Sequence, residues 1–201
     1  MTQTTTNESI RALRLYPKDL GVAVIVLLCL LGGWLLMQVT ITRTRSFQTD
    51  LAPITFTYPS GWIATALPEN VLLQVADPDT TSAFKTTLTV ESRLLDPTSL
   101  PTLQTLLDQR VAERQTLPSY HFLADAETEV AGTRAMRSEF AYVAQPIDAP
   151  RRAALPVVVH AAEYIIVAKD ELYYVTLAAP EGEFPAARAQ LDRVIASLKV
   201  Q

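Results

Sequence analysis

Two histidines are the residues of this 201-residue chain best suited to acid–base or metal chemistry. An imidazole titrates near neutral pH and is a common metal ligand, so His121 and His160 are candidates for a general base or a ligand. His160 falls on the same face of a predicted strand as Tyr164. A single histidine without a nearby carboxylate motif carries little information, so a hydrogen-bonded strand histidine is the favoured interpretation of His160.

Two aspartates offer a second kind of chemistry. Asp77 and Asp79, in the sequence DPDTTS, carry carboxylates that could bind calcium. The loop lacks the ligand spacing and the glycine of an EF-hand, so an ordinary Asp-Pro turn is favoured. The sole cysteine, Cys29, excludes intramolecular disulfides and cysteine-based metal sites. We therefore predict no metal-binding residue.

Sequence motifs of catalysis are missing as well. The six glycines are too scattered for a phosphate-binding loop or a dinucleotide fingerprint. Neither G-x-S-x-G nor H-E-x-x-H occurs. We therefore predict no catalytic residue, no cofactor and no enzymatic activity.

Adjacent arginines, Arg151 and Arg152, are the candidates for partner binding. They lie in QPIDAPRRAALP (145–156), which has three prolines and no periodicity and is predicted to be a long irregular connection. Two guanidinium groups there could pair with the carboxylates of a partner; a solvated loop tip is the alternative. Trp62 could also anchor a partner, but a tryptophan after a Pro-Ser-Gly turn more often packs back on the sheet.

The charge of the chain argues against nucleic acid as a partner. Residues Leu51–Gln201 hold 12 basic and 18 acidic side chains, a net charge of 12 minus 18, or −6. A surface of that sign repels phosphate backbones, and no basic run offsets it.

Alternating and helical patterns predict the elements that would position these residues. Strands come first, then a helix with a leucine stripe, then two hairpins and a closing helix. The predicted strands are Ile54–Tyr58, Val71–Ala76, Phe84–Leu95, His121–Val130, Thr133–Val143, Val157–Ala168 and Leu172–Ala179, and the helices begin near Ser99 and at Phe184.

The last hairpin predicts how many layers the domain has. Pairing Lys169 with Leu172 places apolar side chains on both faces of the two strands, for example Tyr164 on one and Tyr174 on the other. A hairpin that is apolar on both sides belongs in the middle of a sheet covered twice. We therefore predict an α+β fold, an αβα sandwich around an antiparallel sheet.

Residues 20–42 have no charged side chain and predict a transmembrane helix of about 30 Å or slightly more. Residues 1–19 would then be a cytoplasmic tail, 43–51 a linker and 52–201 the domain. The basic residues on the two sides weakly favour a cytoplasmic N-terminus. A cleaved signal peptide is the main alternative, and an uncleaved signal anchor is preferred because the apolar run is long and no A-x-A-like site follows.

Residues at both ends of the domain resemble the PsbP-like and Mog1-like family. ITFTYPSGW (Ile54–Trp62) is similar to the family's opening strand and turn, and LYYVTLAAP with FPAARAQLDRVIASL (Leu172–Leu198) is similar to its last strand and helix. The resemblance covers about Ala52–Gln201. It implies an αβα sandwich, often anchored outside the cytoplasm and often acting as an accessory or assembly factor.

These observations predict a single-pass membrane protein held by the lipid bilayer through residues 20–42. Its domain would lie outside the cytoplasm and bind an unidentified membrane or extracytoplasmic protein without catalysis. The alternative is a small-molecule or metal-binding protein, or an unmarked enzyme, with a site in a cleft of the domain. A deep pocket around His160 or His121 would favour that alternative.

Overall fold

A computed structural model describes residues 17–41, 43–49, 52–96, 101–145, 147–149, 152–153, 155–169 and 171–200. The chain divides into two compact units, Met1–Thr42 and Arg43–Gln201. The predicted cytoplasmic tail lies largely outside the described residues.

The first unit contains helix α1 (Pro17–Ile41). Its side chains are described for residues 21–37, and nearly all of them are exposed. In the part of the chain that the structure describes, no helix is long and apolar enough to cross a membrane. The membrane-spanning role of residues 20–42 therefore stays a prediction.

The second unit is built on a seven-stranded sheet in which every pairing is antiparallel. A second, three-stranded antiparallel sheet has β2 in the centre between β1 and β12. In order across the large sheet, the strands are β3 (Ile63–Ala64), β4 (Val71–Ala76), β5 (Thr87–Leu94), β11 (Glu171–Pro180), β10 (Val157–Ala168), β7 (Thr133–Ala144) and β6 (His121–Val130). The small sheet contains β1 (Thr44–Thr49), β2 (Ala52–Pro59) and β12 (Lys199–Val200).

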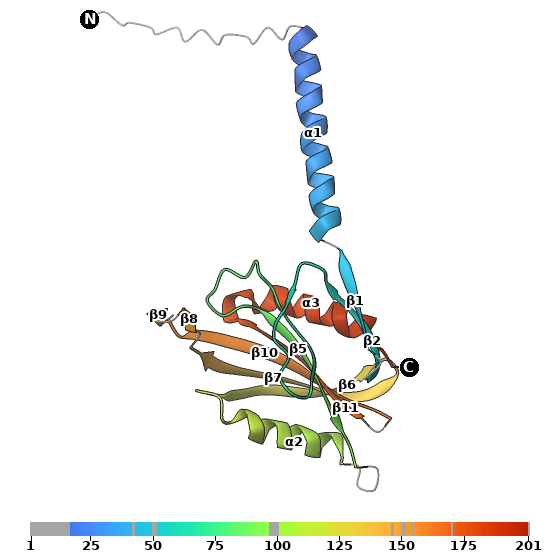
Figure 1. The fold of residues 1–201 in the computed structure, drawn as a ribbon, viewed down its shortest axis with the longest axis vertical. Helices are drawn as coiled ribbons and strands as arrows, with labels where there is room; N and C mark the ends of the chain where they lie inside the picture. The colour runs from blue at the N-terminus through green and yellow to red at the C-terminus, as the bar shows by residue number, and fades with distance from the viewer. Residues whose placement is uncertain are drawn as a thin grey trace, which may run out of the picture. The chain divides into compact units, whose positions relative to one another are not determined.

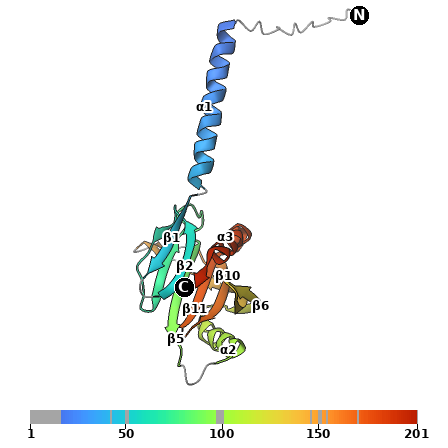
Figure 2. The same ribbon diagram turned by 90° about the vertical axis from the view of Figure 1, so that its right-hand side faces the viewer.

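Helices cover both faces of the large sheet, as the hairpin pattern predicted. Helix α2 (Leu103–Arg114) packs on one face and α3 (Phe184–Ser197), which follows a 3-10 turn at Glu181–Glu183, packs on the other (Figures 1 and 2). The α3 side forms the larger core together with β2, and Leu191 and Ile54 are almost fully buried in it. The α2 side forms a second core that includes Leu106 and Ile165. The α+β fold with its αβα layers is thus confirmed.

The central hairpin shows why its faces could be predicted although its register was not. The structure pairs Tyr164 with Val175, whereas the predicted pairing of Lys169 with Leu172 would place Tyr164 opposite Leu177. This is a shift of two residues, and side chains alternate with a period of two. Each residue therefore keeps its predicted face.

Two segments differ from the sequence-based expectation. Residues 43–51, predicted as a linker, contain β1, which pairs with β2 along most of its length. Residues 145–156, predicted as irregular, contain β8 (Ile147–Ala149) and β9 (Arg152–Ala153), which pair with each other. Both lie outside the seven-stranded sheet, and neither has the apolar alternation by which a buried strand is recognised.

Candidate binding cleft

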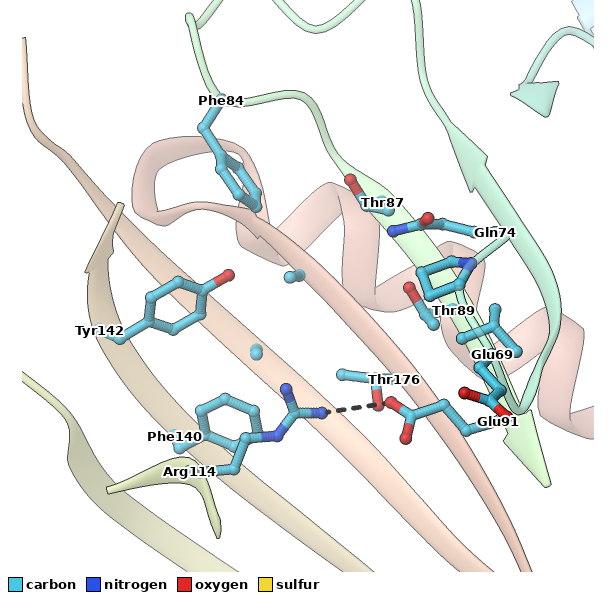
Figure 3. A pocket seen from close by; sticks show the side chains of 14 residues that line it. Glu69, Gln74, Phe84, Thr87, Thr89, Glu91, Arg114, Phe140, Tyr142 and Thr176 are labelled. Carbon is cyan, nitrogen blue, oxygen red and sulfur yellow. Dashed lines mark ion pairs between the residues drawn. The ribbon is translucent and has the colours of Figure 1, made fainter. Parts of the chain in front are cut away.

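A cleft of about 460 Å³ opens on the face of the large sheet that α2 covers in part. Helix α2 ends at Arg114, and beyond it the strands carry short side chains that leave the sheet surface hollow. Short side chains line it, namely the threonines Thr87, Thr89 and Thr176 (Figure 3) and the alanines Ala161 and Ala178.

Aromatic rings form one wall of the cleft. The rings of Phe84 and Tyr142 meet edge to face with centroids 6.4 Å apart, and Phe140 lies 6.3 Å from Tyr142. Figure 3 shows the Tyr142 hydroxyl directed into the cleft. Burial raises the pKa of Tyr142, so its hydroxyl stays protonated at neutral pH and can donate a hydrogen bond.

The opposite wall is polar and acidic. Gln74 of β4 and Glu91 of β5 lie there together with Glu69, which precedes β4. Groups of this kind accept or donate hydrogen bonds, so the cleft has an apolar side and a polar side.

Arg114 closes one end of the cleft through a buried ion-pair network. Its Nη2 atom lies 2.8 Å from Oε1 of Glu163, a carboxylate with only 1% of its side chain exposed. Arg110 Nε donates to the same carboxylate at 3.0 Å, and Thr176 Oγ1 donates at 2.7 Å. Burial acts to raise the pKa of Glu163, but the charges of Arg110 and Arg114 outweigh it and hold that pKa below its usual value.

The network extends outward to the surface of α2. Arg110 Nη2 lies 2.7 Å from Glu91, and Arg93 forms a two-pronged pair with Glu113 at 2.7 and 3.0 Å. The hydrogen bond from Arg93 lowers the pKa of Glu113 to about 2. Three arginines thus face three glutamates, which makes the cluster neutral and fixes the position of Arg114.

One donor at the cleft is left over. Arg114 Nε is buried, and none of the described residues accepts a hydrogen bond from it. A buried donor without a partner costs free energy. At the cleft itself, the guanidinium group of Arg114 can contact a polar group and the ring of Tyr142 an apolar one.

The described residues that line the cleft include no histidine, cysteine, serine or lysine. The polar side chains that do line it are threonine and tyrosine hydroxyls, the carboxylates of Glu69 and Glu91, Gln74 and Arg114.

Comparisons with known proteins show which fold this domain has. No protein-family model and no curated protein matches the sequence. Among solved structures, the cyanobacterial PsbP protein (CyanoP) of Synechocystis superposes with a TM-score of 0.60 at 14% identity, covering 80% of this chain and 94% of that one. LpqN of Mycobacterium tuberculosis superposes with a TM-score of 0.57 at 9% identity, covering 80% of this chain and 92% of LpqN. The Ran-binding protein Mog1p of Saccharomyces cerevisiae superposes with a TM-score of 0.51 at 13% identity, covering 79% of this chain and 95% of Mog1p. The domain has the PsbP/Mog1-like fold.

Neither histidine of the sequence lies at the cleft. The ring of His160 stacks on Phe184 with centroids 3.6 Å apart, and its Nε2 is buried 3.7 Å from Glu139 without a hydrogen-bond partner among the described residues. Ring packing thus helps to hold His160, and burial lowers its pKa. His121 and His160 both pair with Ala141, so one strand separates them. That is roughly 10 Å, too far for one metal ion.

Other candidate residues are structural or are not tested. Asp77 accepts a hydrogen bond from the backbone of Asp79 at 3.0 Å, the geometry of the predicted turn. Trp62 is 8% exposed and packs in the core, as expected. Arg151 lies outside the described residues, and of Arg152 only the backbone, in β9, is described.

Sequence reasoning missed the cleft itself. The available signal was the threonines on the polar face of the fifth strand, Thr87 and Thr89, and Thr176 in the otherwise apolar run of β11. Without the strand order, nothing indicated that β5 and β11 are neighbours or that α2 ends beside them.

Proposed function

We propose that this protein is a membrane-anchored, non-catalytic accessory factor whose domain binds another protein outside the cytoplasm. The observation that carries the proposal is the open cleft, which joins aromatic rings, hydroxyl groups and a fixed arginine. Such a surface can accept an aromatic or polar side chain from a partner.

The structural neighbours are consistent with a binding role. Mog1p is described as a Ran-binding protein, and LpqN as involved in cell envelope biogenesis. Both share the fold at low sequence identity, so they support an accessory role in general and indicate no particular partner. The partner is to be found by experiment.

The anchor rests on the sequence of α1. Residues 20–42 carry no charge, and the described side chains of α1 expose large apolar groups such as Leu30 and Leu36. A lipid bilayer would cover them. Protease added to intact cells, or to spheroplasts where an outer envelope intervenes, should remove the domain. Cleavage only after lysis would place the domain in the cytoplasm instead.

The binding role is tested by filling the cleft. Thr89→Phe places a ring over the floor, and Ala112→Phe adds the same ring on the exposed side of α2 outside the cleft. Intact membrane protein is crosslinked and purified, and the bound proteins are identified. We expect Thr89→Phe to lose a partner that the wild type and Ala112→Phe retain. Equal recovery from all three, with normal folding, would refute binding through the cleft.

A small molecule in the same cleft is the second candidate. The volume and the mixed apolar and polar walls favour it, since both suit a compact ligand. Native mass spectrometry of the purified chain distinguishes the two candidates. An added mass that Thr89→Phe removes, without any protein partner, would favour the small molecule.

A further inference from the structure

Strand β6 forms an open edge of the large sheet. It pairs with β7 on one side and is the last strand in the order, so its other edge meets no strand among the described residues. Eight of its ten residues are exposed. An edge of this length presents backbone N–H and C=O groups to which another strand can add.

A bulge limits the usable part of this edge. The register with β7 shifts between Phe122 and Ala124, and from Ala124 to Val130 the pairing is regular. The regular part is seven residues long. A bulge twists the strand, so an added strand fits best after it.

Carboxylates line one face of the regular part. Asp125, Glu127 and Glu129 follow each other at every second position, so they share a face, and Glu127 pairs with Met136, a residue of the core beneath α2. Arg134 neutralises Glu127 at 2.8 Å. Among the described residues, no ion pair engages Asp125 or Glu129.

This charge pattern decides which strand fits. In two copies of β6 paired antiparallel about Glu127, that residue meets its own copy and Asp125 meets Glu129. Like charges directly opposite each other destabilise a strand pair, so a second copy is disfavoured. A strand with Lys or Arg at every second position meets the opposite charge instead. On the other face of β6, Ala124 and Ala126 are too small to obstruct it.

We infer that residues Ala124–Val130 of β6 form a docking edge for an extended segment of a partner protein with basic residues at alternate positions. The segment adds as an eighth strand, held by backbone hydrogen bonds and by Asp125 and Glu129. This goes beyond the proposed cleft function and does not depend on it, because none of these residues lines the cleft.

The test uses the full chain in nanodiscs and a nine-residue peptide with lysine at every second position and threonine or valine between. We expect binding that weakens with salt, and protection of amides in 124–130 from hydrogen exchange. A matched peptide with glutamate in place of lysine should not bind. Two further peptides carry methyl groups on the backbone nitrogens of the lysines or of the other residues, and at least one of them should not bind.

Variants separate the edge from general charge attraction. Asp125→Asn with Glu129→Gln should weaken the lysine peptide at least about threefold. Asp108→Asn with Asp192→Asn removes two exposed carboxylates from α2 and α3 and should change binding little. Equal weakening by both pairs, or undiminished binding of both methylated peptides, would overturn the inference. Concentration-dependent protection of 124–130 without peptide would show that a second copy occupies the edge. If the crosslinking experiment finds no partner at the cleft, these peptide-binding measurements still test the β6 edge by themselves.

Discussion

Glu163 shows how one buried residue can organise a functional surface. It is 1% exposed, yet it accepts hydrogen bonds from Arg110, Arg114 and Thr176. A charge in that position needs such partners, because burial of an unpaired carboxylate is costly. Through Arg114 it fixes the end of the cleft.

Removing this carboxylate should be strongly destabilising. Glu163→Ala leaves the guanidinium groups of Arg110 and Arg114 without a central partner, and we expect the free energy of unfolding to fall by about 3–5 kcal/mol. Urea unfolding of residues 43–201 measures it. Glu127→Ala, which breaks the exposed pair with Arg134, should cost far less, because solvent screens exposed ion pairs. Equal losses for the two variants would contradict a central role for Glu163.

The same carboxylates predict acid sensitivity. The pKa values of Glu163 and Glu113 are lowered in the folded state, that of Glu113 to about 2. A lowered folded-state pKa contributes stability above the unfolded pKa, and this stability is lost as pH falls through the folded value. Stability should therefore decline from about pH 5 toward pH 2. Urea unfolding at several pH values should show a shallower decline for Glu113→Gln than for the wild type. An identical slope would argue against the contribution of Glu113.

At the scale of elements, the β6–β7 turn was predicted from its sequence and can be improved. Ala131 and Gly132 both have positive φ, 51° and 78°. A tight hairpin turn with that backbone favours Asn-Gly, and an alanine in the left-handed region is strained. We expect Ala131→Asn to stabilise the domain by about 0.5–1 kcal/mol. The midpoint of urea unfolding should rise; an unchanged or lower midpoint would contradict the turn geometry.

Elements with strong periodicity were the ones that the sequence predicted well. The strands His121–Val130 and Val157–Ala168 match β6 and β10, because apolar alternation and turn residues mark their ends. The start of α2 was predicted too early, near Ser99; its cap is Thr102, whose hydroxyl accepts the backbone N–H of Thr105 at 3.1 Å. Pro101 lies immediately before that cap, outside the helix.

The cleft could not be predicted because it depends on neighbours in space. Arg114, Tyr142 and Thr89 come from α2, β7 and β5, and only the strand order brings them together. Likewise, sequence spacing gave no sign that Glu139 would lie 3.7 Å from His160, since the two residues meet across β7 and β10. Local sequence patterns predict which face of a strand a residue occupies, while the pairing of distant strands decides which residues meet at a cleft.

At the scale of the whole molecule, the segment 145–156 with Arg151 and Arg152 remains a predicted contact for an acidic partner. Changing both residues to alanine should alter the free energy of unfolding by no more than about 0.5 kcal/mol, as is usual for surface substitutions. Partner capture should weaken, and more so at low salt. Unchanged capture at low salt, with normal expression and membrane insertion, would leave the segment as a simple connection.

The most direct test of the proposed function is photocrosslinking from inside the cleft in the native membrane. A photoreactive phenylalanine replaces Phe84 in the cleft wall or, as a control, Leu94, which is 83% exposed and lies outside the cleft. The proposed function predicts one protein adduct from position 84 that is missing from position 94 and is lost when Thr89→Phe is added. No protein adduct from position 84, or the same adducts from both positions, would contradict it.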